Sequence, residues 1–320
     1  MRLHQLLQAI CLAAQIGPAM AQTYPTKPIR LIVPFAAGGP VDVVAREVGQ
    51  KLGSELGQTI LVENQGGGAG IAALTTVTRA EPDGYTLLFA ASGNIVLQPQ
   101  VSKTGGANLV AKLRPVAMVS AGPQVLVVSS KLPVKTVKEF IDHAHDHPGA
   151  LSYASAGVGG VSHLGMEYLQ ALAKTQMTHV PYKGTSAAFS DLAAGNVQAM
   201  FSSPPSLQAA IDKGYVRALG MSAPGGAGAM KSLPLIASTV PGCEFTTWYA
   251  LYAPLGTPPA IVEKLGNAVR KTVADPALKA RMEAQGVELT YASAQELTQV
   301  VKRDTDKWAK VIRDAKITVE

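Results

Sequence analysis

Five short segments rich in glycine and serine each close an apolar run and precede a helix-like pattern. They are residues 35–39, 92–93, 155–157, 182–185 and 202–203. In an open α/β sheet, such turns lie at the carboxyl ends of strands, where helix N-termini offer unpaired N–H groups to an anion. The pattern predicts a site that holds an anionic solute mainly through backbone and hydroxyl groups.

The first and third segments are the main candidates for ligand contacts. Gly38 and Gly39 lack a Cβ, so backbone N–H groups there can approach a ligand, and the dipole of the next helix favours an anion. A tight turn that needs a positive φ explains these glycines equally well. The third segment surrounds Ser155, Ser162 and His163 with further glycines, so it offers two hydroxyls and an imidazole.

Catalytic machinery is sparse in this sequence. Ser162 and His163 could act as nucleophile and base, but neighbours at a helix start point in different directions. There is no Gly-Lys-Ser/Thr P-loop and no Gly-x-Ser-x-Gly elbow, and residues 157–162 end in serine where a dinucleotide fingerprint needs glycine. We therefore expect a binding protein without a cofactor. An exported hydrolase is the minor alternative, which turnover of esters or amides would support.

Three histidines, His143, His145 and His147, alternate near a helix end and suggest a metal site. Residues two apart on a helix lie on different faces, however, so the three rings do not converge. We interpret them as a solvated helix end and expect no metal. Trp248 and Tyr249 are interpreted as core or cleft wall rather than as a platform for a cofactor.

The N-terminus has the pattern of an export signal. Arg2 and His4 precede a mostly apolar stretch at 6–16, and residues 19–21 fit the small-x-small cleavage rule. This predicts a signal peptide at residues 1–21 and a periplasmic protein. Cys11 follows a poor lipobox, so we favour a soluble exported protein over a lipoprotein or a retained anchor. Removal of the signal leaves Cys243 as the single cysteine, which excludes an intramolecular disulfide.

Length and charge bound the function classes. The 320 residues suffice for two domains of ordinary size. The net charge of +6 at pH 7 is a mild excess that attracts anions to the surface. Only 5% of residues are aromatic and no dense Lys/Arg run is present, so we expect no nucleic-acid partner.

Apolar runs alternate with helix-like patterns, which indicates βαβ units and an α/β fold. The predicted strands are 29–35, 59–63, 84–90, 125–129, 152–155, 177–180, 197–201, 216–220 and 248–253. Residues 105–113 are poorly patterned and are predicted to be a loop. Helix-start signals at 136–139, 258–259, 276 and 293–296 predict one helix in the middle of the chain and three near its end.

Two sheet-forming regions joined near 116–126 and again near 216–228 predict two hinged lobes with a ligand cleft between them. We assign residues 22–122 and 227–320 to lobe 1 and residues 123–226 to lobe 2.

Several motifs in order over the mature chain together resemble the Bug-type (TctC-like) solute receptors of tripartite tricarboxylate transporters. They are Tyr24-Pro25-x-Lys27-Pro28-Ile29-Arg30-x-Ile32-Val33-Pro34-Phe35, Gly38-Gly39-Pro40-x-Asp42, Val62-Glu63-Asn64, Pro82-Asp83-Gly84-Tyr85-Thr86-Leu87-Leu88, Tyr153-Ala154-Ser155-Ala156-Gly157, Ser162-His163-Leu164, His179-Val180-Pro181-Tyr182-Lys183-Gly184 and Ala253-Pro254-x-Gly256-Thr257-Pro258. No single block is specific, but the ordered set is.

The resemblance implies a two-lobed periplasmic binding fold, type II-like, that closes like a Venus flytrap, each lobe a mostly parallel sheet flanked by helices. It implies that backbone N–H groups of the first loop hold the ligand carboxylate, partly through bridging water. The ligand-binding residues expected in the first lobe are Phe35, Gly38, Gly39, Val41, Asp42, Ser92 and Gly93. Those expected in the second lobe are Ser155, Ala156, Gly157, Gly159, His163, Tyr182 and Ser202.

One departure from the family pattern bears on the ligand. Relatives that bind amino acids place an aspartate after the strand that matches 197–201, where it pairs with the ligand ammonium, whereas this chain has Ser202 and Ser203. A buried ammonium without a partner is costly, so we expect a mono- or dicarboxylate without a positive charge. Asp42 could supply a charge, but its place at a helix start favours a capping role.

The expected function is capture of a small organic acid and its delivery to the membrane permease of a tripartite tricarboxylate transporter. The same trap could instead dock a membrane sensor, and a permease encoded next to this protein would favour transport. Receptors of this kind need no oligomer, so we expect a monomer.

Overall fold

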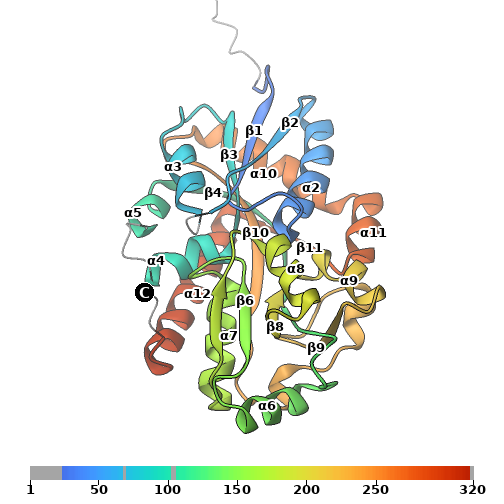
Figure 1. Ribbon diagram of the computed structural model, residues 1–320. Helices are drawn as coiled ribbons and strands as arrows, with labels where there is room; N and C mark the ends of the chain where they lie inside the picture. Colours follow the sequence, from blue (N-terminus) through green and yellow to red (C-terminus); the bar gives the residue numbers. More distant parts are fainter. Residues whose placement is uncertain (1–23, 68–69, 102–105, 318–320) are drawn as a thin grey trace, which may run out of the picture.

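The computed structural model describes residues 24–67, 70–101 and 106–317, and the structural statements below concern these residues. The expected signal peptide at residues 1–21 lies outside them. Two β-sheets flanked by helices form two lobes, which occupy the upper and lower parts of Figure 1.

The first lobe is built on a six-stranded sheet in the order β11-β4-β10-β3-β1-β2. Its strands are β1 (Ile29–Val33), β2 (Ile60–Asn64), β3 (Thr86–Ala91), β4 (Leu113–Pro123), β10 (Thr246–Pro254) and β11 (Leu289–Ser293). Strand β1 pairs in parallel with β2 and β3. The pairs of β10 with β3 and β4, and of β11 with β4, are antiparallel.

The second lobe is built on a five-stranded sheet in the order β7-β6-β8-β5-β9. Its strands are β5 (Val125–Ser129), β6 (Ser152–Ser155), β7 (Thr178–Pro181), β8 (Ala199–Ser202) and β9 (Val216–Met221). Strand β6 pairs in parallel with β7 and β8, whereas β5 pairs antiparallel with β8 and β9.

These sheets confirm the two-lobed α/β fold. We had expected mostly parallel sheets, but both sheets are mixed. The reason lies in how the chain passes between the lobes. Strand β5 brings the chain into the second lobe and β10 brings it back into the first, so both begin at the interlobe side. The strands of the βαβ units end at that side, and their pairs with β5 and β10 are therefore antiparallel.

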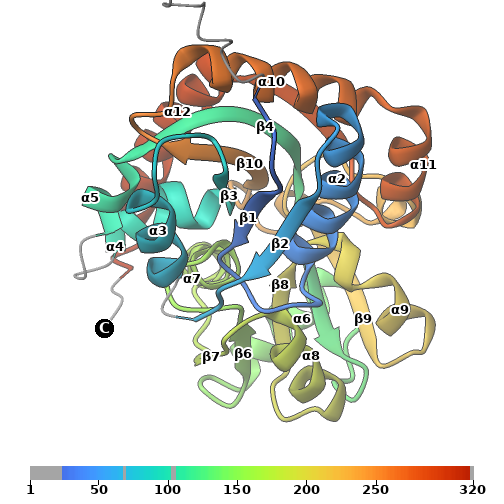
Figure 2. The same ribbon diagram turned by 90° about the horizontal axis from the view of Figure 1, so that it is seen from above.

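Helices cover both faces of the first sheet, which Figure 2 shows from above. Helices α2 (Pro40–Leu56), α10 (Pro259–Ala274) and α11 (Pro276–Ala284) share one apolar core with Leu31 and Val33 of β1. Helices α3 (Ile71–Thr78) and α12 (Ala294–Asp314) pack on the opposite face, where Ile32 and Leu88 are buried. Because both faces are covered, these strands appear in the sequence as continuous apolar runs.

The remaining helices connect or flank the strands of the two lobes. In the first lobe they are a π-helical segment η2 (Gly93–Leu97), α4 (Gln98–Val101) and α5 (Gly106–Val110). In the second lobe they are α6 (Val137–Asp146), α7 (Val161–Ala173), α8 (Thr185–Ala194), the 3-10 turn η3 (Pro204–Ser206) and α9 (Gln208–Asp212). Short 3-10 turns η4 (Gly228–Ser232) and η5 (Ile236–Ser238) follow β9.

The loop predicted at 105–113 is wrong. Residues Gly106–Val110 form α5, and β4 already begins at Leu113. Leu109 and Val110 pack against the core of α3 and α12, and this tertiary contact stabilises a helix that is too short to show a periodic pattern. Strand β11 was also missed, because its residues are only partly buried and do not form an apolar run.

Two adjacent chain segments join the lobes. The first crosses at Gln124, between β4 and β5, and the second returns from β9 to β10. Ser222, which is buried, ties them together: its hydroxyl accepts from the Gln124 N–H at 2.9 Å and donates to the Phe245 carbonyl at 2.6 Å. The sheets thus divide the chain near the predicted crossings, while the lobe boundaries at 122/123 and 226/227 stay a prediction.

The three predicted C-terminal helices are confirmed, each at its expected start signal. Pro259 and Pro276 occupy the first turns of α10 and α11. Ser293 and Glu296 form a capping box at the start of α12, which carries Trp308 and Val311 into the core.

Replacing Ser293 with alanine removes the side-chain acceptor for the N–H of Glu296. We expect Ser293→Ala to lower the free energy of unfolding by about 1 kcal/mol, the usual contribution of an N-cap. Urea unfolding followed by circular dichroism measures the change. Thr298→Ala, at an exposed position in the second turn of the same helix, serves as the control and should be near neutral; an equal loss in both variants would contradict the capping role.

Candidate functional site

A cavity of about 680 Å³ lies between the two lobes, at the ends of β1, β3, β6, β7 and β8. It is lined by Pro34, Phe35, Ala36, Gly39, Pro40, Val41, Gly67, Gly70, Ile71, Ala91, Gly93, Asn94, Gln98, Val101, Gln124, Ala156, Gly157, Val158, Gly160, Val161, Ser162, Pro181, Tyr182, Lys183, Thr185, Phe201, Ser202, Ser203, Thr247 and Tyr249. A volume of this size is in the range of small-molecule sites.

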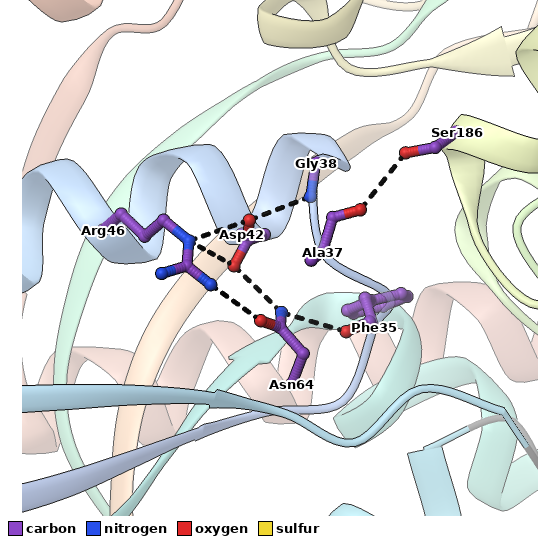
Figure 3. Close-up of polar contacts among 7 residues, drawn as sticks. All are labelled: Phe35, Ala37, Gly38, Asp42, Arg46, Asn64 and Ser186. Atoms are coloured by element: carbon purple, nitrogen blue, oxygen red, sulfur yellow. Dashed lines mark hydrogen bonds and ion pairs between the residues drawn. The ribbon is translucent and has the colours of Figure 1, made fainter.

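The loop between β1 and α2 forms one wall of the cavity and is held by Asp42 (Figure 3). The buried Asp42 carboxylate accepts from the Gly38 N–H at 2.9 Å, from Asn64 Nδ2 at 2.9 Å and from Arg46 Nε at 3.0 Å. Asn64 Nδ2 also donates to the Phe35 carbonyl at 3.1 Å. The loop is therefore fixed at both of its ends from behind.

The Asp42 network sets the protonation state of that carboxyl. Burial raises the pKa of Asp42, but hydrogen bonds from Arg46, Gly38 and Asn64 together outweigh burial and hold the pKa below its usual range. The carboxylate is thus charged, and it is oriented toward its own loop. It does not line the cavity, and it accepts from the Gly38 N–H of the preceding loop instead of capping the first N–H groups of α2, as the sequence had favoured.

Three helices begin at the cavity wall. Gly39, Pro40 and Val41 belong to the start of α2, Gly160 to that of α7, and Thr185 to that of α8. The first N–H groups of a helix have no intrahelical acceptor, and the helix dipole adds positive potential there. Within the described residues, no side chain caps any of these three starts.

The lining contains a single charged residue within the described part of the chain, Lys183, whose side chain is exposed. No carboxylate lines the cavity there. Helix dipoles and one exposed ammonium give this wall a positive potential, so an anionic ligand is favoured over a cationic one.

The loop between β6 and α7 is internally hydrogen-bonded. Its N–H groups donate to side chains of the same segment: Ala156 to Ser162 Oγ at 3.1 Å, Gly157 to Ser155 Oγ at 3.2 Å and Gly159 to His163 Nδ1 at 3.1 Å. Because these N–H groups already have acceptors, this loop contributes to the cavity wall mainly through its shape. Ser162 and His163 hold the loop in place and therefore have a structural role.

His163 belongs to a stack of rings beneath this loop, in which His163 and Tyr153 are buried and His179 is half-buried. It stacks on His179 with ring centroids 3.8 Å apart, and His179 stacks on Tyr153 at 4.9 Å. The rings also make polar contacts: His179 Nε2 lies 2.7 Å from Ser155 Oγ, and the Tyr153 hydroxyl contacts the Glu167 carboxylate. Burial lowers the pKa of His163 to about 3, with a further contribution from His179, and burial lowers the pKa of His179 to about 4.

The histidine stack predicts an acid-sensitive second lobe. The folded protein keeps both rings neutral, whereas the unfolded chain binds protons below the ordinary histidine pKa of about 6.5. Stability is therefore complete above that pH and falls as the pH drops toward 4, by up to about 1.4 kcal/mol per pH unit and per ring. His163→Asn keeps an acceptor for the Gly159 N–H and should flatten this slope. Urea unfolding from pH 7.5 to 4.5 measures it.

The matched control for that experiment is His145→Asn, at an exposed position on α6. It should retain the wild-type slope. A wild-type stability that stays constant between pH 6.5 and 4.5 would contradict the neutral stack.

The lobes touch each other around the cavity. Ser186 Oγ of α8 donates to the Ala37 carbonyl of the first lobe at 3.4 Å (Figure 3). A Cβ at Gly184 would lie 3.0 Å from the Cβ of Ala36, and one at Gly93 would lie 3.2 Å from the backbone N of Val161. These close approaches show a closed arrangement in which both lobes contribute to one cavity.

The residues expected to bind ligand fall into two groups. Those that line the cavity are Phe35, Gly39, Val41, Gly93, Ala156, Gly157, Tyr182 and Ser202. Those that lie behind the lining are Gly38, Asp42, Ser92, Ser155, Gly159 and His163. The second group is buried or bonded to the lining loops; Ser92, for example, shares a 3.1 Å hydrogen bond with Thr247.

Several lining residues were missed by sequence reasoning. Gln98 and Val101 follow the π-helical segment η2, Gln124 lies in the first crossing segment, and Thr247 lies in β10. The sequence marks Gln98 with no turn or glycine, so no local signal could have identified it. Tyr249 had been interpreted as core or cleft wall; it lines the cavity, whereas Trp248 is buried and donates to Asp304 at 2.9 Å.

The histidines near the end of α6 do not form a metal site in the structure. The helix ends at Asp146, and the rings of His143 and His147 stack with centroids 4.4 Å apart. Within the described ranges, no group of His, Cys, Asp or Glu side chains is arranged to hold a metal ion.

Comparisons with known proteins place this geometry in a family. The model of the tripartite tricarboxylate transporter family receptor, TctC, matches residues 44–317. The protein BugT of Bordetella pertussis is 30% identical over 311 residues, which cover 95% of this chain and 94% of BugT.

Two solved structures from Rhodopseudomonas palustris carry a ligand. Rpa4515, solved with adipate, is 30% identical, with a TM-score of 0.87, over 92% of this chain and 99% of that one. MatC (Rpa3494), solved with bound malate, is 31% identical, with a TM-score of 0.84, over 90% of this chain and 100% of that one.

Proposed function

Because the chain belongs to the tripartite tricarboxylate transporter receptor family, we propose that it captures a small organic acid without an ammonium group in its interlobe cavity. The family consists of solute-binding receptors and not of enzymes. The observation that carries the proposal is the convergence of the α2, α7 and α8 starts on a cavity whose described lining has no carboxylate.

The ligand carboxylate binds at the α2 start in this proposal. Gly39 and Val41 line the cavity there, and Pro40 between them lacks an N–H, so the free donors are those of its neighbours. The Gly38 N–H is already held by Asp42, which keeps the loop in place before a ligand arrives. A preformed loop spares the ligand the cost of ordering it.

Adipate and malate, which two relatives hold, fit this class of ligand. Both are acids without an ammonium. The apolar lining residues, among them Ile71, Val101 and Val161, favour an acid with an apolar body over a fully hydroxylated one.

In the periplasm, the loaded receptor then delivers its acid to a membrane permease. Closure follows from contacts with both lobes, such as the Ser186–Ala37 hydrogen bond, which exist only when the lobes meet.

No helix in the described part of the chain is long and apolar enough to cross a bilayer. We propose that the receptor acts as a monomer. A role as the receptor of a membrane sensor is the second candidate, since the same closed form would serve it.

A thermal-shift screen of refolded, ligand-free protein tests the binding proposal. Mono-, di- and tricarboxylates, aromatic acids and amino acids are each added at about a thousand times a micromolar Kd, where mass action stabilises by roughly 4 kcal/mol. Acids without an ammonium should raise Tm clearly and amino acids should not. A rise for amino acids alone would contradict the ligand class, and turnover of esters or amides would contradict a receptor.

A further inference from the structure

Three buried polar side chains meet at one part of the cavity wall. Gln124 comes from the first crossing segment, Ser203 follows β8, and Tyr249 lies in β10. All three line the cavity, and each is less than a tenth exposed. Gln124 Nε2 donates to Ser203 Oγ at 2.6 Å, and the Tyr249 hydroxyl donates to the same Oγ at 2.8 Å.

A count of protons shows that this trio is incomplete. A hydroxyl has one proton and two lone pairs, and both lone pairs of Ser203 Oγ are used by Gln124 and Tyr249. Its own proton has no acceptor among the described residues. If the Tyr249–Ser203 bond is reversed, the spare proton moves to Tyr249, which also lines the cavity.

The trio cannot resolve this by losing a proton. Burial raises the pKa of Tyr249 to about 12, while its hydrogen bond with Ser203 lowers it only in part, so the hydroxyl stays protonated at neutral pH. A buried donor without an acceptor is unfavourable. The trio therefore presents the uncommitted hydroxyl proton of Ser203 to whatever occupies the cavity.

We infer that the Ser203 hydroxyl, held by Gln124 and Tyr249, donates to a second oxygen acceptor of the bound acid and so selects oxygenated acids over alkyl and amino acids. This rests on the proposed function. The first carboxylate lies at the start of α2, and the second acceptor is a carboxylate or a carbonyl oxygen. An ammonium at the same place would face the uncommitted Ser203 proton and find no free lone pair on Ser203.

The test uses a series of probes built on the parent acid that gives the largest shift in the screen. For a six-carbon parent, hexanoate is compared with 2-oxohexanoate and adipate, which add an acceptor at either end, and with 2-aminohexanoate and 6-aminohexanoate, which add an ammonium. Calorimetric titration gives Kd for each. In wild-type protein, one oxygenated acid should bind at least tenfold tighter than the parent, and neither amino acid should.

Ser203→Ala removes the donor. It should abolish the tenfold gain of the oxygenated acid over the parent acid. Tyr249→Phe removes one of the two groups that orient Ser203, so its loss should be smaller. Ser54→Ala, an exposed position on α2 whose hydroxyl bonds to the Gln50 carbonyl, is the matched control and should bind like wild type. Circular dichroism verifies that each variant is folded.

The outcomes separate this inference from the proposed function. If the parent binds but oxygenated acids gain nothing, if the gain survives in Ser203→Ala, or if an amino acid binds most tightly, the inference is overturned. Binding of the parent acid itself would still support a carboxylate receptor in the first two cases. If no acid in the screen binds, the proposed function fails and this inference fails with it.

Discussion

Gly66→Ala is expected to weaken binding of the acid at least tenfold with little change in overall fold. Gly66 lies in the turn after β2, outside the cavity lining. A Cβ at this position would lie 2.7 Å from the backbone N of Ala36 and 3.1 Å from the backbone carbon of Phe35. Backbone atoms cannot rotate away as a flexible side chain can, so the loop that faces the ligand must move.

The effect of Gly66→Ala on affinity follows from how the ligand is held. Backbone N–H groups bind an anion well only at hydrogen-bond distance and in line, and a shift of several tenths of an ångström lengthens each bond. A tenfold loss corresponds to about 1.4 kcal/mol, the size of one or two weakened hydrogen bonds. Calorimetric titration with the best acid of the screen measures this loss.

Gly57→Ala is the control for the cost of a mutated glycine. Gly57 ends α2 with φ of 68°, and a Cβ there would meet no atom within 4 Å. We expect Gly57→Ala to be destabilised by about 1 kcal/mol, because alanine is strained at positive φ, with an unchanged Kd. Wild-type affinity in Gly66→Ala would contradict the role of the 35–39 loop in binding.

Asp42→Asn is expected to have the largest effect on stability. The amide keeps the size of the carboxylate but turns an N–H₂ toward Gly38, Asn64 or Arg46, all of which are donors to Asp42. A buried donor then faces another donor, and we expect a loss of about 2 kcal/mol in the free energy of unfolding. Affinity should fall as well, because the Gly38 N–H no longer holds the loop.

The pH dependence gives a second readout for Asp42. Its pKa in the folded protein is below the ordinary value, so its contribution to stability is present above about pH 4 and is lost as the pH falls through the folded pKa. The difference in stability between wild type and Asp42→Asn should therefore shrink below about pH 4. Guanidinium unfolding at pH 7 and at pH 3 measures it.

Asp306→Asn provides the matched control. Asp306 pairs with Lys302 on the exposed face of α12, where both side chains are mostly solvated. Such a pair contributes less than about 1 kcal/mol, so this variant should be nearly as stable as wild type. Equal losses in the two variants would contradict the special role of the Asp42 network.

The strands and turns of the fold could be predicted because their signals are local. The apolar run of β1, the Pro40 start of α2 and its Gly57 end all lie within one segment of sequence. The mixed direction of the sheets could not be predicted in this way. It depends on where β5 and β10 enter the lobes, which is set by the path of the chain over more than a hundred residues.

The cavity wall could be predicted where it is made of turns, as at Phe35, Gly39 and Tyr182. It could not be predicted where the fold brings distant residues together. Gln124 and Tyr249 are far apart in sequence and meet only through Ser203. The His163–His179 stack is similar, since β7 and α7 must pack before the rings can touch.

A crystal structure of the protein with the best acid of the screen tests the central claim most directly. We expect the acid to lie in the interlobe cavity, with one carboxylate within hydrogen-bond distance of the N–H groups of Gly39 or Val41 at the start of α2. An acid bound elsewhere, or bound in the cavity with its carboxylate away from all three helix starts, would contradict the account.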